Sequence, residues 1–213
     1  MPYFGTNPVG TSSANVSAST TVGDGTAEDT KLVFDGNALD FRIGIDDGTD
    51  KLEIGKGNAH GTTTHMTIDT NGIVTTPLQS GVFARLSANQ SINNATLTKI
   101  AYDEEGYDIL NEFASNKFTA TAAGIYNVTS MLAMALGDGD RLFSGLYKNG
   151  SLIHRTQVLA GAAESAKSHL TANVQLSASD YLEVFAQHDY GTARNITGGN
   201  DGSYTYFFIN KIA

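Results

Sequence analysis

The sequence predicts an all-β protein in which a C-terminal jelly-roll β-sandwich follows a segment of short strands. Apolar and polar residues alternate in short runs, turn residues end nearly every run, and no segment shows sustained helical periodicity with caps. The 213 residues include 23 glycines but no cysteine or tryptophan, a composition suited to short strands joined by tight turns. Disulfide and thiolate chemistry are therefore excluded.

Residues 1–26 are rich in Ser, Thr, Gly and Ala and contain little that could be buried. Such a composition is typical of a segment that stays flexible or becomes ordered only on a partner. We expect either a peptide that anchors the chain to a larger particle or a plain disordered tail.

Residues 27–77 repeat one theme, a short alternating apolar run closed by Asp, Gly or Asn, as in LVFDGN, FRIGIDDG, LEIGKGN and MTIDTNG. Each run predicts a short strand that ends in a turn, and Asn71-Gly72 is a hairpin signal. The apolar residues are too few, on strands too short, to close a core within one chain. They would be buried if chains met around an axis, so we expect a trimeric β-rich stem. They are Leu32, Phe34, Phe41, Ile43, Ile45, Leu52, Ile54, Met66, Ile68 and Ile73.

Residues 78–213 show strand signals at regular intervals, which predicts a jelly roll. Asn149-Gly150 lies between two alternating runs and predicts a type I′ hairpin turn. The candidate strands are 82–88, 97–102, 117–122, 124–136, 141–158, 168–178, 181–189 and 203–212.

Four features of this third segment occur together. They are Phe118 with Gly124, Tyr126 and Val128 in FTATAAGIYNV, the hairpin Lys148-Asn149-Gly150, Leu176 with Asp180 in VQLSASDYLEVF, and Phe207 in the closing strand. With these residues the segment resembles the globular head of the first complement component, which belongs to the tumour-necrosis-factor-like superfamily. The resemblance implies a jelly-roll head that packs as three copies around an axis, with aromatic residues at the centre.

Two predicted strands are apolar on both faces, GIYNVTSMLAMAL (124–136) and SYTYFFINKI (203–212). One face of a sandwich strand fills the core and the other normally meets water, so an apolar second face indicates further cover. We expect partner chains to supply it, and the alternative is that loops of the same chain do. The residues expected in core or trimer packing are Phe118, Tyr126, Met131, Met134, Tyr204, Tyr206, Phe207 and Phe208.

Residues 22–58, with MTIDTNG at 66–72, resemble segments of tail-fibre-like structural proteins of bacteriophages. This resemblance implies a homotrimeric appendage on the exterior of a virion, assembled in the host cytoplasm and joined to another virion protein through residues 1–26.

Several classes of function are disfavoured by the sequence. The formal net charge of −9 speaks against nucleic acid as a partner. Residues 1–20 do not show a basic start followed by an apolar core, and no long apolar run occurs, so we expect neither Sec export nor membrane insertion. No GxSxG motif, P-loop, cysteine nucleophile or paired carboxylate motif points to an enzyme. The scattered histidines, and the acidic stretches at 46–50, 103–105 and 138–140, predict turns and packing rather than a metal site, so we expect no metal and no cofactor.

The function expected from these observations is adhesion to a host surface glycan or protein, without enzymatic activity. The loops 137–141, 160–168 and 189–203 are the candidate contact surfaces. Two alternatives remain open, a structural protein that decorates a capsid or caps a tail hub without binding a receptor, and a soluble lectin of the complement-head type. The candidate receptor-facing residues are Asp138, Asp140, Asn195, Asn200 and Asp201.

Overall fold

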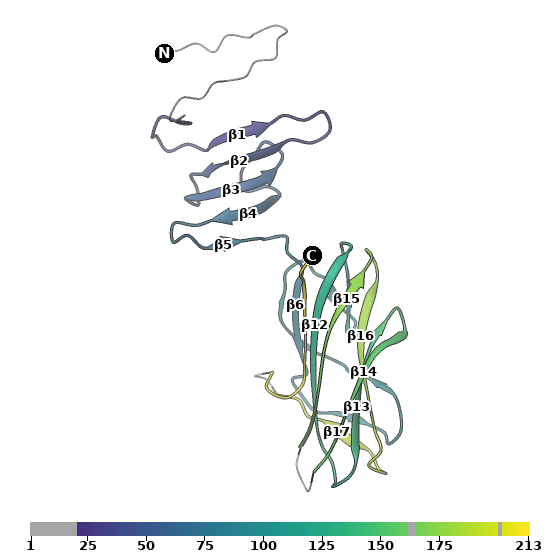
Figure 1. The fold of residues 1–213 in the computed structure, drawn as a ribbon. Coiled ribbons are helices and arrows are strands. Elements are labelled where there is room, and N and C mark those ends of the chain that lie inside the picture. Colours follow the sequence, from purple (N-terminus) through teal and green to yellow (C-terminus); the bar gives the residue numbers. More distant parts are fainter. Residues whose placement is uncertain (1–20, 162–164, 200–201) are drawn as a thin grey trace. The chain divides into compact units, whose positions relative to one another are not determined.

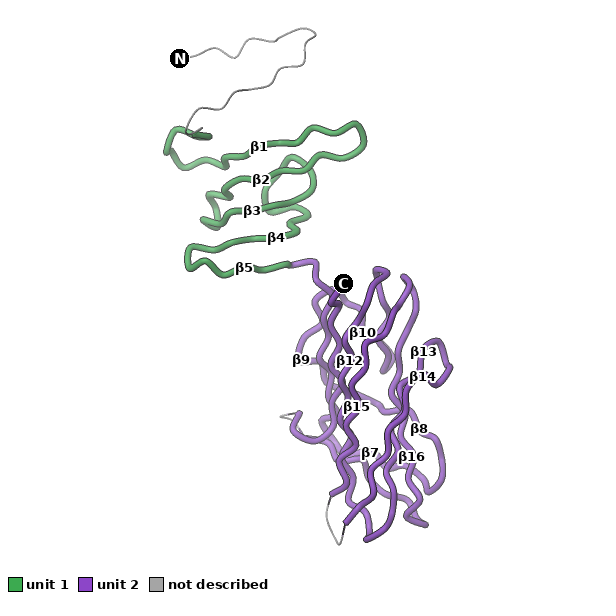
Figure 2. Tube along the Cα trace, in the orientation of Figure 1, with its two compact units in different colours: residues 1–76 green, residues 77–213 purple. Residues whose placement is uncertain are grey.

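The computed structural model describes residues 21–161, 165–199 and 202–213, so the expectations placed on residues 1–20, Asn200 and Asp201 lie outside the described residues. The chain divides into two compact units, residues 1–76 (unit 1) and residues 77–213 (unit 2), coloured separately in Figure 2. The described part is built from strands and turns, which confirms the all-β class. It contains no helix long and apolar enough to cross a membrane.

Unit 1 is one antiparallel sheet in which consecutive strands pair in the order β1-β2-β3-β4-β5 (Figure 1). Turn residues separate the strands as their sequence predicts. The Asp46 carboxylate accepts a hydrogen bond from the Gly48 backbone N–H (3.1 Å), and Asp69 accepts from the N–H groups of Asn71 and Ile73 (2.9 Å each). The strands are β1 (Thr30–Phe34), β2 (Phe41–Asp46), β3 (Lys51–Lys56), β4 (Thr64–Ile68) and β5 (Val74–Thr75).

Unit 2 consists of two antiparallel sheets. The first has the order β10-β11-β16-β13-β14, with β8 paired to β16; the second has the order β7-β17-β12-β18-β6-β9, with β15 paired to β12 (Figure 1). Their strands are β6 (Gly81–Arg85), β7 (Gln90–Ile92), β8 (Thr98–Lys99), β9 (Glu104–Asp108), β10 (Phe113–Ala114), β11 (Lys117–Thr119), β12 (Gly124–Ala135), β13 (Arg141–Lys148), β14 (Ser151–Leu159), β15 (Ser165–Leu176), β16 (Tyr181–His188), β17 (Arg194–Ile196) and β18 (Tyr206–Lys211).

The core of unit 2 fills the space between these sheets. Alternate residues of each strand point inward because successive side chains of a strand lie on opposite faces. On β16, for example, Leu182, Val184 and Ala186 are buried while the residues between them are partly exposed. One polar contact crosses the core, between the hydroxyl oxygens of Ser144 on β13 and Ser168 on β15 (2.8 Å).

The β13–β14 hairpin turns at Asn149 and Gly150, which both have positive φ, 51° and 78°, as a type I′ turn requires. Asp180 fixes this turn to the next one along the sheet. Hydrogen bonds from Lys148, from the Asn149 side chain and from the Ser177 N–H lower the pKa of Asp180 to about 2.

The strands differ from the predicted ones mainly at their ends. The closing strand begins at Tyr206 rather than at residue 203, although the Thr205 carbonyl still accepts from the Leu86 N–H (3.1 Å). The short strands β7, β9, β10 and β17 were not predicted, and β17 lies inside the segment 189–203 that was expected to be a loop.

Candidate interaction surfaces

Unit 1 carries its apolar residues on one face of the sheet. Strand register places them side by side, since Leu32 pairs with Ile43, Ile43 with Ile54, and Ile54 with Met66. No member of this set is fully buried, and Phe34 is 62% exposed. The set, called here the apolar face, is Leu32, Phe34, Phe41, Ile43, Ile45, Leu52, Ile54, Met66, Ile68 and Val74.

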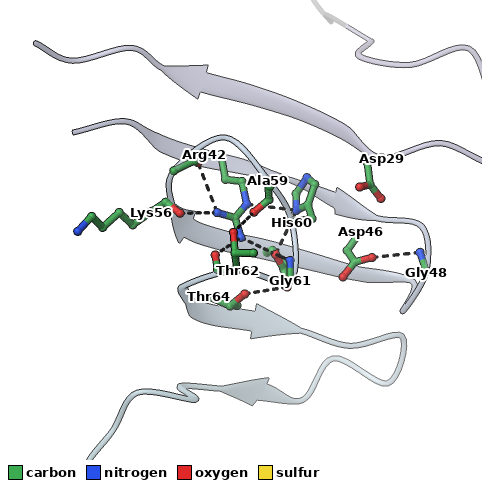
Figure 3. A network of polar contacts seen from close by, with 12 residues as sticks. Asp29, Arg42, Asp46, Gly48, Lys56, Ala59, His60, Gly61, Thr62 and Thr64 are labelled. Atoms are coloured by element: carbon green, nitrogen blue, oxygen red, sulfur yellow. Dashed lines mark hydrogen bonds and ion pairs between the residues drawn. The ribbon is translucent and has the colours of Figure 1, made fainter. Parts of the chain in front are cut away.

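The opposite face of unit 1 is buried by the segment 57–63 and is polar. Arg42 is fully buried and its guanidinium donates to the Glu53 carboxylate (2.9 Å) and to the carbonyls of Lys56 (2.7 Å) and Thr62 (2.9 Å) (Figure 3). Gly55 leaves room for this group, because a Cβ there would lie 2.8 Å from a guanidinium nitrogen. Unit 1 thus buries charge while its apolar side chains remain uncovered in one chain.

Glu53 is the acceptor at the centre of this network. Burial disfavours its ionisation, but hydrogen bonds from Arg42, the Gly61 N–H, His60 and Thr64 outweigh it and lower the pKa of Glu53 to about 2. The arrangement is structural, because every partner belongs to unit 1 and fixes the segment 57–63 against the sheet.

Unit 2 carries four aromatic side chains on the outer face of the sheet that contains β6, β9 and β18. Phe83 lies at its centre, 6.1 Å from the ring of Tyr107 and 6.1 Å from that of Tyr206, and Tyr107 lies 6.5 Å from Phe208. All four are partly exposed, Tyr107 at 44%. Gly106 accommodates Phe83, since a Cβ at that position would lie 2.5 Å from the ring. This aromatic patch (Phe83, Tyr107, Tyr206 and Phe208) is a second uncovered apolar surface.

The eight residues expected in core or trimer packing fall into two groups. Four of them, Phe118, Tyr126, Met134 and Phe207, are buried between the sheets, and at most 1% of the surface of each residue is exposed to solvent. The others, Met131, Tyr204, Tyr206 and Phe208, lie on the outer side, half-buried except for Tyr204, which is 41% exposed.

The second face of β12 is less apolar than the segment 131–135 alone suggests. Its middle carries Asn127 and Thr129, which face the polar residues Asn173 and Thr171 of β15. Ala133, on the same face, is fully buried within one chain, where its N–H donates to the Thr205 hydroxyl (3.3 Å) and its carbonyl accepts from the Thr197 N–H (2.8 Å). Cover by the same chain, the alternative explanation, thus accounts for this part of the strand.

The described receptor-facing candidates lie near the C-terminal end of β12, where Met134 is paired with Ile196. Asp138 is exposed, whereas the Asp140 carboxylate accepts from the Gly137 N–H (3.0 Å) and so shapes its own turn. Asn195 is exposed but belongs to β17, where it pairs with Ser91 of β7.

The acidic stretches take part in local contacts. Asp103 accepts from the backbone and hydroxyl groups of Ser87 (2.7 Å each), and Glu104 pairs with Arg85. Across the described residues, no group of three or more His, Cys, Asp or Glu side chains is arranged to hold a metal ion.

The sequence analysis missed two members of the aromatic patch, Phe83 and Tyr107. The alternation in GVFAR does place Phe83 on the face opposite Val82 and Ala84, which was an available signal. Tyr107 gave no such signal, because it belongs to the unpredicted strand β9, whose pairing with β6 contains a register shift between Phe83 and Ala84.

Several solved structures share the fold of part of the chain. No protein-family model matches the sequence. The Eiger TNF structure from S. frugiperda is similar over 63% of this chain and 93% of its own, with a TM-score of 0.51 at 8% identity. Murine APRIL is similar over 63% of this chain and 99% of its own, with a TM-score of 0.50 at 11% identity. The globular domain of the zebrafish complement 1qA protein matches over 63% of this chain with a TM-score of 0.47 at 12% identity.

These likenesses confirm the predicted architecture, an all-β chain with a jelly roll of the TNF-like kind. At such low identity the fold alone is shared. The role of the chain has to be argued from its own surfaces.

Proposed function

We propose that the chain forms a homotrimeric, non-enzymatic fibre or spike on a virus particle, which attaches to a host surface glycan or protein. The observation that carries the proposal is the apolar face of unit 1, a sheet whose buried side is ionic and whose other side carries ten apolar side chains, five of them exposed and five half-buried. An exposed apolar surface of this kind marks a site of interaction with another surface.

Copies of the same chain are the occupants that best fit this face. Fully burying one large apolar side chain contributes about 1.5–3 kcal/mol, so burial of the five exposed side chains of this face is comparable with an association cost of about 4–15 kcal/mol. Unit 2 supplies a second uncovered surface, the aromatic patch, on the same chain. Two such surfaces support one assembly that uses both units.

The number of copies follows from the resemblance of unit 2 to the complement head. That family packs three heads around an axis lined with aromatic residues, and the aromatic patch offers such residues on β6, β9 and β18. Residues 27–77 form one thin sheet per chain, which suits three sheets that share their apolar faces.

The place of this trimer on a virion rests on the resemblance of residues 22–58 to phage tail-fibre segments. A trimer presents three copies of any receptor-facing surface, so that weak contacts combine into useful avidity. A capsid-decorating protein would share the trimer but would bind no receptor.

The mass of the full-length chain in solution tests the trimer. Light scattering should give three times the chain mass of 22.5 kDa over a wide concentration range. A monodisperse single-chain mass at high concentration would contradict the proposal.

Two further experiments separate the virion roles. Deleting residues 1–26 should abolish incorporation into particles for a fibre or a capsid protein, and should leave a free lectin unaffected. Purified protein added to susceptible cells should block infection only for a receptor-binding fibre, so incorporation without blocking would favour the capsid-decorating alternative.

A further inference from the structure

The outer face of the β13-β14-β16 sheet carries a hollow of about 120 Å³. We propose that this hollow binds a carboxylate-bearing sugar ring, such as a uronate or a sialic-acid-type residue, at the surface of a polysaccharide or glycan. The inference deepens the proposed adhesive function by naming its ligand class and site, and it rests on that function only for its biological use.

The hollow exists because a glycine lies at the centre of four larger side chains. Along β13, Phe143 and Tyr147 are the neighbours of Gly145 on the same face, and across the sheet Gly145 is paired with Arg155 of β14 and Phe185 of β16. A Cβ at position 145 would lie 3.0 Å from both Leu152 Cδ1 and Tyr147 Cε2. A side chain at this position would therefore fill the depression.

Aromatic rings form the walls of the hollow. The rings of Tyr147 and Phe185 lie 4.6 Å apart and are tilted by 54°, and the ring of Phe143 lies under the Arg155 guanidinium at 4.3 Å. All three rings lie on the outer face of the sheet and are half-buried there. Such rings offer apolar surfaces against which the C–H face of a sugar ring can pack, and the Arg155 contact holds the guanidinium plane in place.

The charge at the hollow is positive in a chain of net charge −9. Glu183 on the same face is neutralised by Lys99 (2.7 Å). Among the described residues, no carboxylate forms an ion pair with Arg155, whose guanidinium is exposed. A guanidinium binds a carboxylate through two parallel hydrogen bonds, so Arg155 selects an acidic ligand.

The size and the rim of the hollow restrict the ligand further. Pockets for drug-sized molecules measure about 300–1,000 Å³, so a hollow of about 120 Å³ admits a single ring. At the rim, the Gln187 side-chain N–H donates to the Ala95 carbonyl (2.8 Å), which leaves its carbonyl oxygen to accept from a sugar hydroxyl. A single ring with hydroxyl groups and one carboxylate satisfies all of these contacts.

Saturation-transfer NMR on the full chain tests this site, with sodium glucuronate and N-acetylneuraminate as probes and glucose as the uncharged comparison. Both acids should receive saturation, and glucose should bind at least about tenfold more weakly because it offers no carboxylate. Arg155→Gln should weaken binding of the acids by about tenfold, and Arg155→Lys should lie between the two because it keeps the charge but loses the paired hydrogen bonds.

Arg141→Gln is the matched control. Arg141 lies on β13, the strand beside the β14 of Arg155, but it is paired with Asp189 (3.1 Å), and its loss should leave binding unchanged. Filling the hollow with Gly145→Ala should also reduce binding in a variant whose melting temperature matches that of the wild type. The proposal is wrong if the acids bind Arg155→Gln as they bind the wild type, if glucose binds equally well, or if no probe is saturated.

Light scattering on the same samples separates this inference from the proposed trimer. The hollow and the aromatic patch lie on different sheets of unit 2. A trimer without sugar binding refutes the hollow alone. A single-chain species that binds the acids refutes the trimer and leaves the hollow standing.

Discussion

Arg42 and Glu53 form a buried ion pair in the small sheet of unit 1. A buried pair gives little net stability compared with apolar residues, but removal of one partner leaves an uncompensated charge. Here the pair also receives hydrogen bonds from His60, from the Gly61 N–H and from Thr64, all at or near the segment that covers this face. The ion pair therefore holds the segment 57–63 against this face of the sheet, and the apolar side chains lie on the opposite face.

Glu53→Gln should destabilise unit 1 by about 3 kcal/mol, because Arg42 would then be buried without a counter-charge. Chemical denaturation followed by NMR signals of unit 1 would measure the change. The control is Asp189→Asn, which breaks the exposed ion pair with Arg141 and should cost less than about 1 kcal/mol. An equal loss of unfolding free energy in the two variants would show that the buried network contributes no more to stability than the exposed ion pair.

The same carboxylate predicts how unit 1 responds to acid. The pKa of Glu53 is about 2 in the folded chain against an ordinary value of 4.5. A depressed pKa contributes stability that is fully present above pH 4.5 and is lost as the pH falls towards 2. Unit 1 should therefore lose stability in this window, as measured by amide exchange at Gly61, and the loss should be smaller in Glu53→Gln. A wild-type profile that stays flat down to pH 2 would contradict the assignment.

At the scale of elements, the β13–β14 hairpin depends on a residue without a side chain. Gly150 has φ +78°, a conformation that costs an L-residue about 1–2 kcal/mol. Gly150→Ala should destabilise unit 2 by about 1 kcal/mol in thermal or chemical unfolding. Gly161→Ala is the control, because Gly161 has no positive φ and no atom of the described residues lies within 4 Å of an added Cβ. A neutral Gly150→Ala would mean that the turn relaxes into another type.

The long strands of unit 2 could be predicted from sequence, and some of its shortest ones could not. β12, β15 and β16 have 12, 12 and 8 residues, long enough for a period of two to stand out. β10 has two residues and β7 and β17 have three each, so no periodicity exists to detect. The aromatic patch and the hollow also depend on register between strands far apart in the chain, which alternation within one strand does not define.

The ionic face of unit 1 was missed for a related reason. Arg42 and Glu53 belong to separate predicted strands, and the alternation places each on the face opposite the apolar residues. A polar sheet face ordinarily meets water. Only the path of the segment 57–63, which lacks regular structure, covers the pair and makes it buried.

At the scale of the whole molecule, adjacent residues of β18 separate folding from self-association. Phe207 is 1% exposed and packs against the rings of Tyr102 (6.0 Å) and Phe113 (6.1 Å) in the core. Phe208 points to the other face, in the aromatic patch, 6.5 Å from the ring of Tyr107. The two positions have the same residue type on the same strand, so a change at each tests one face at a time.

Phe208→Ser should yield a folded chain of lower mass in light scattering, because it removes part of the patch without entering the core. Phe207→Ser should instead cost about 3–5 kcal/mol of folding free energy and reduce the yield of folded protein. The wild type should melt at a temperature that rises with protein concentration, since association stabilises the folded chain by mass action, and Phe208→Ser should lose much of that dependence. If Phe208→Ser keeps the wild-type mass and the same concentration dependence, the aromatic patch does not mediate association, and the apolar face of unit 1 would have to do so alone.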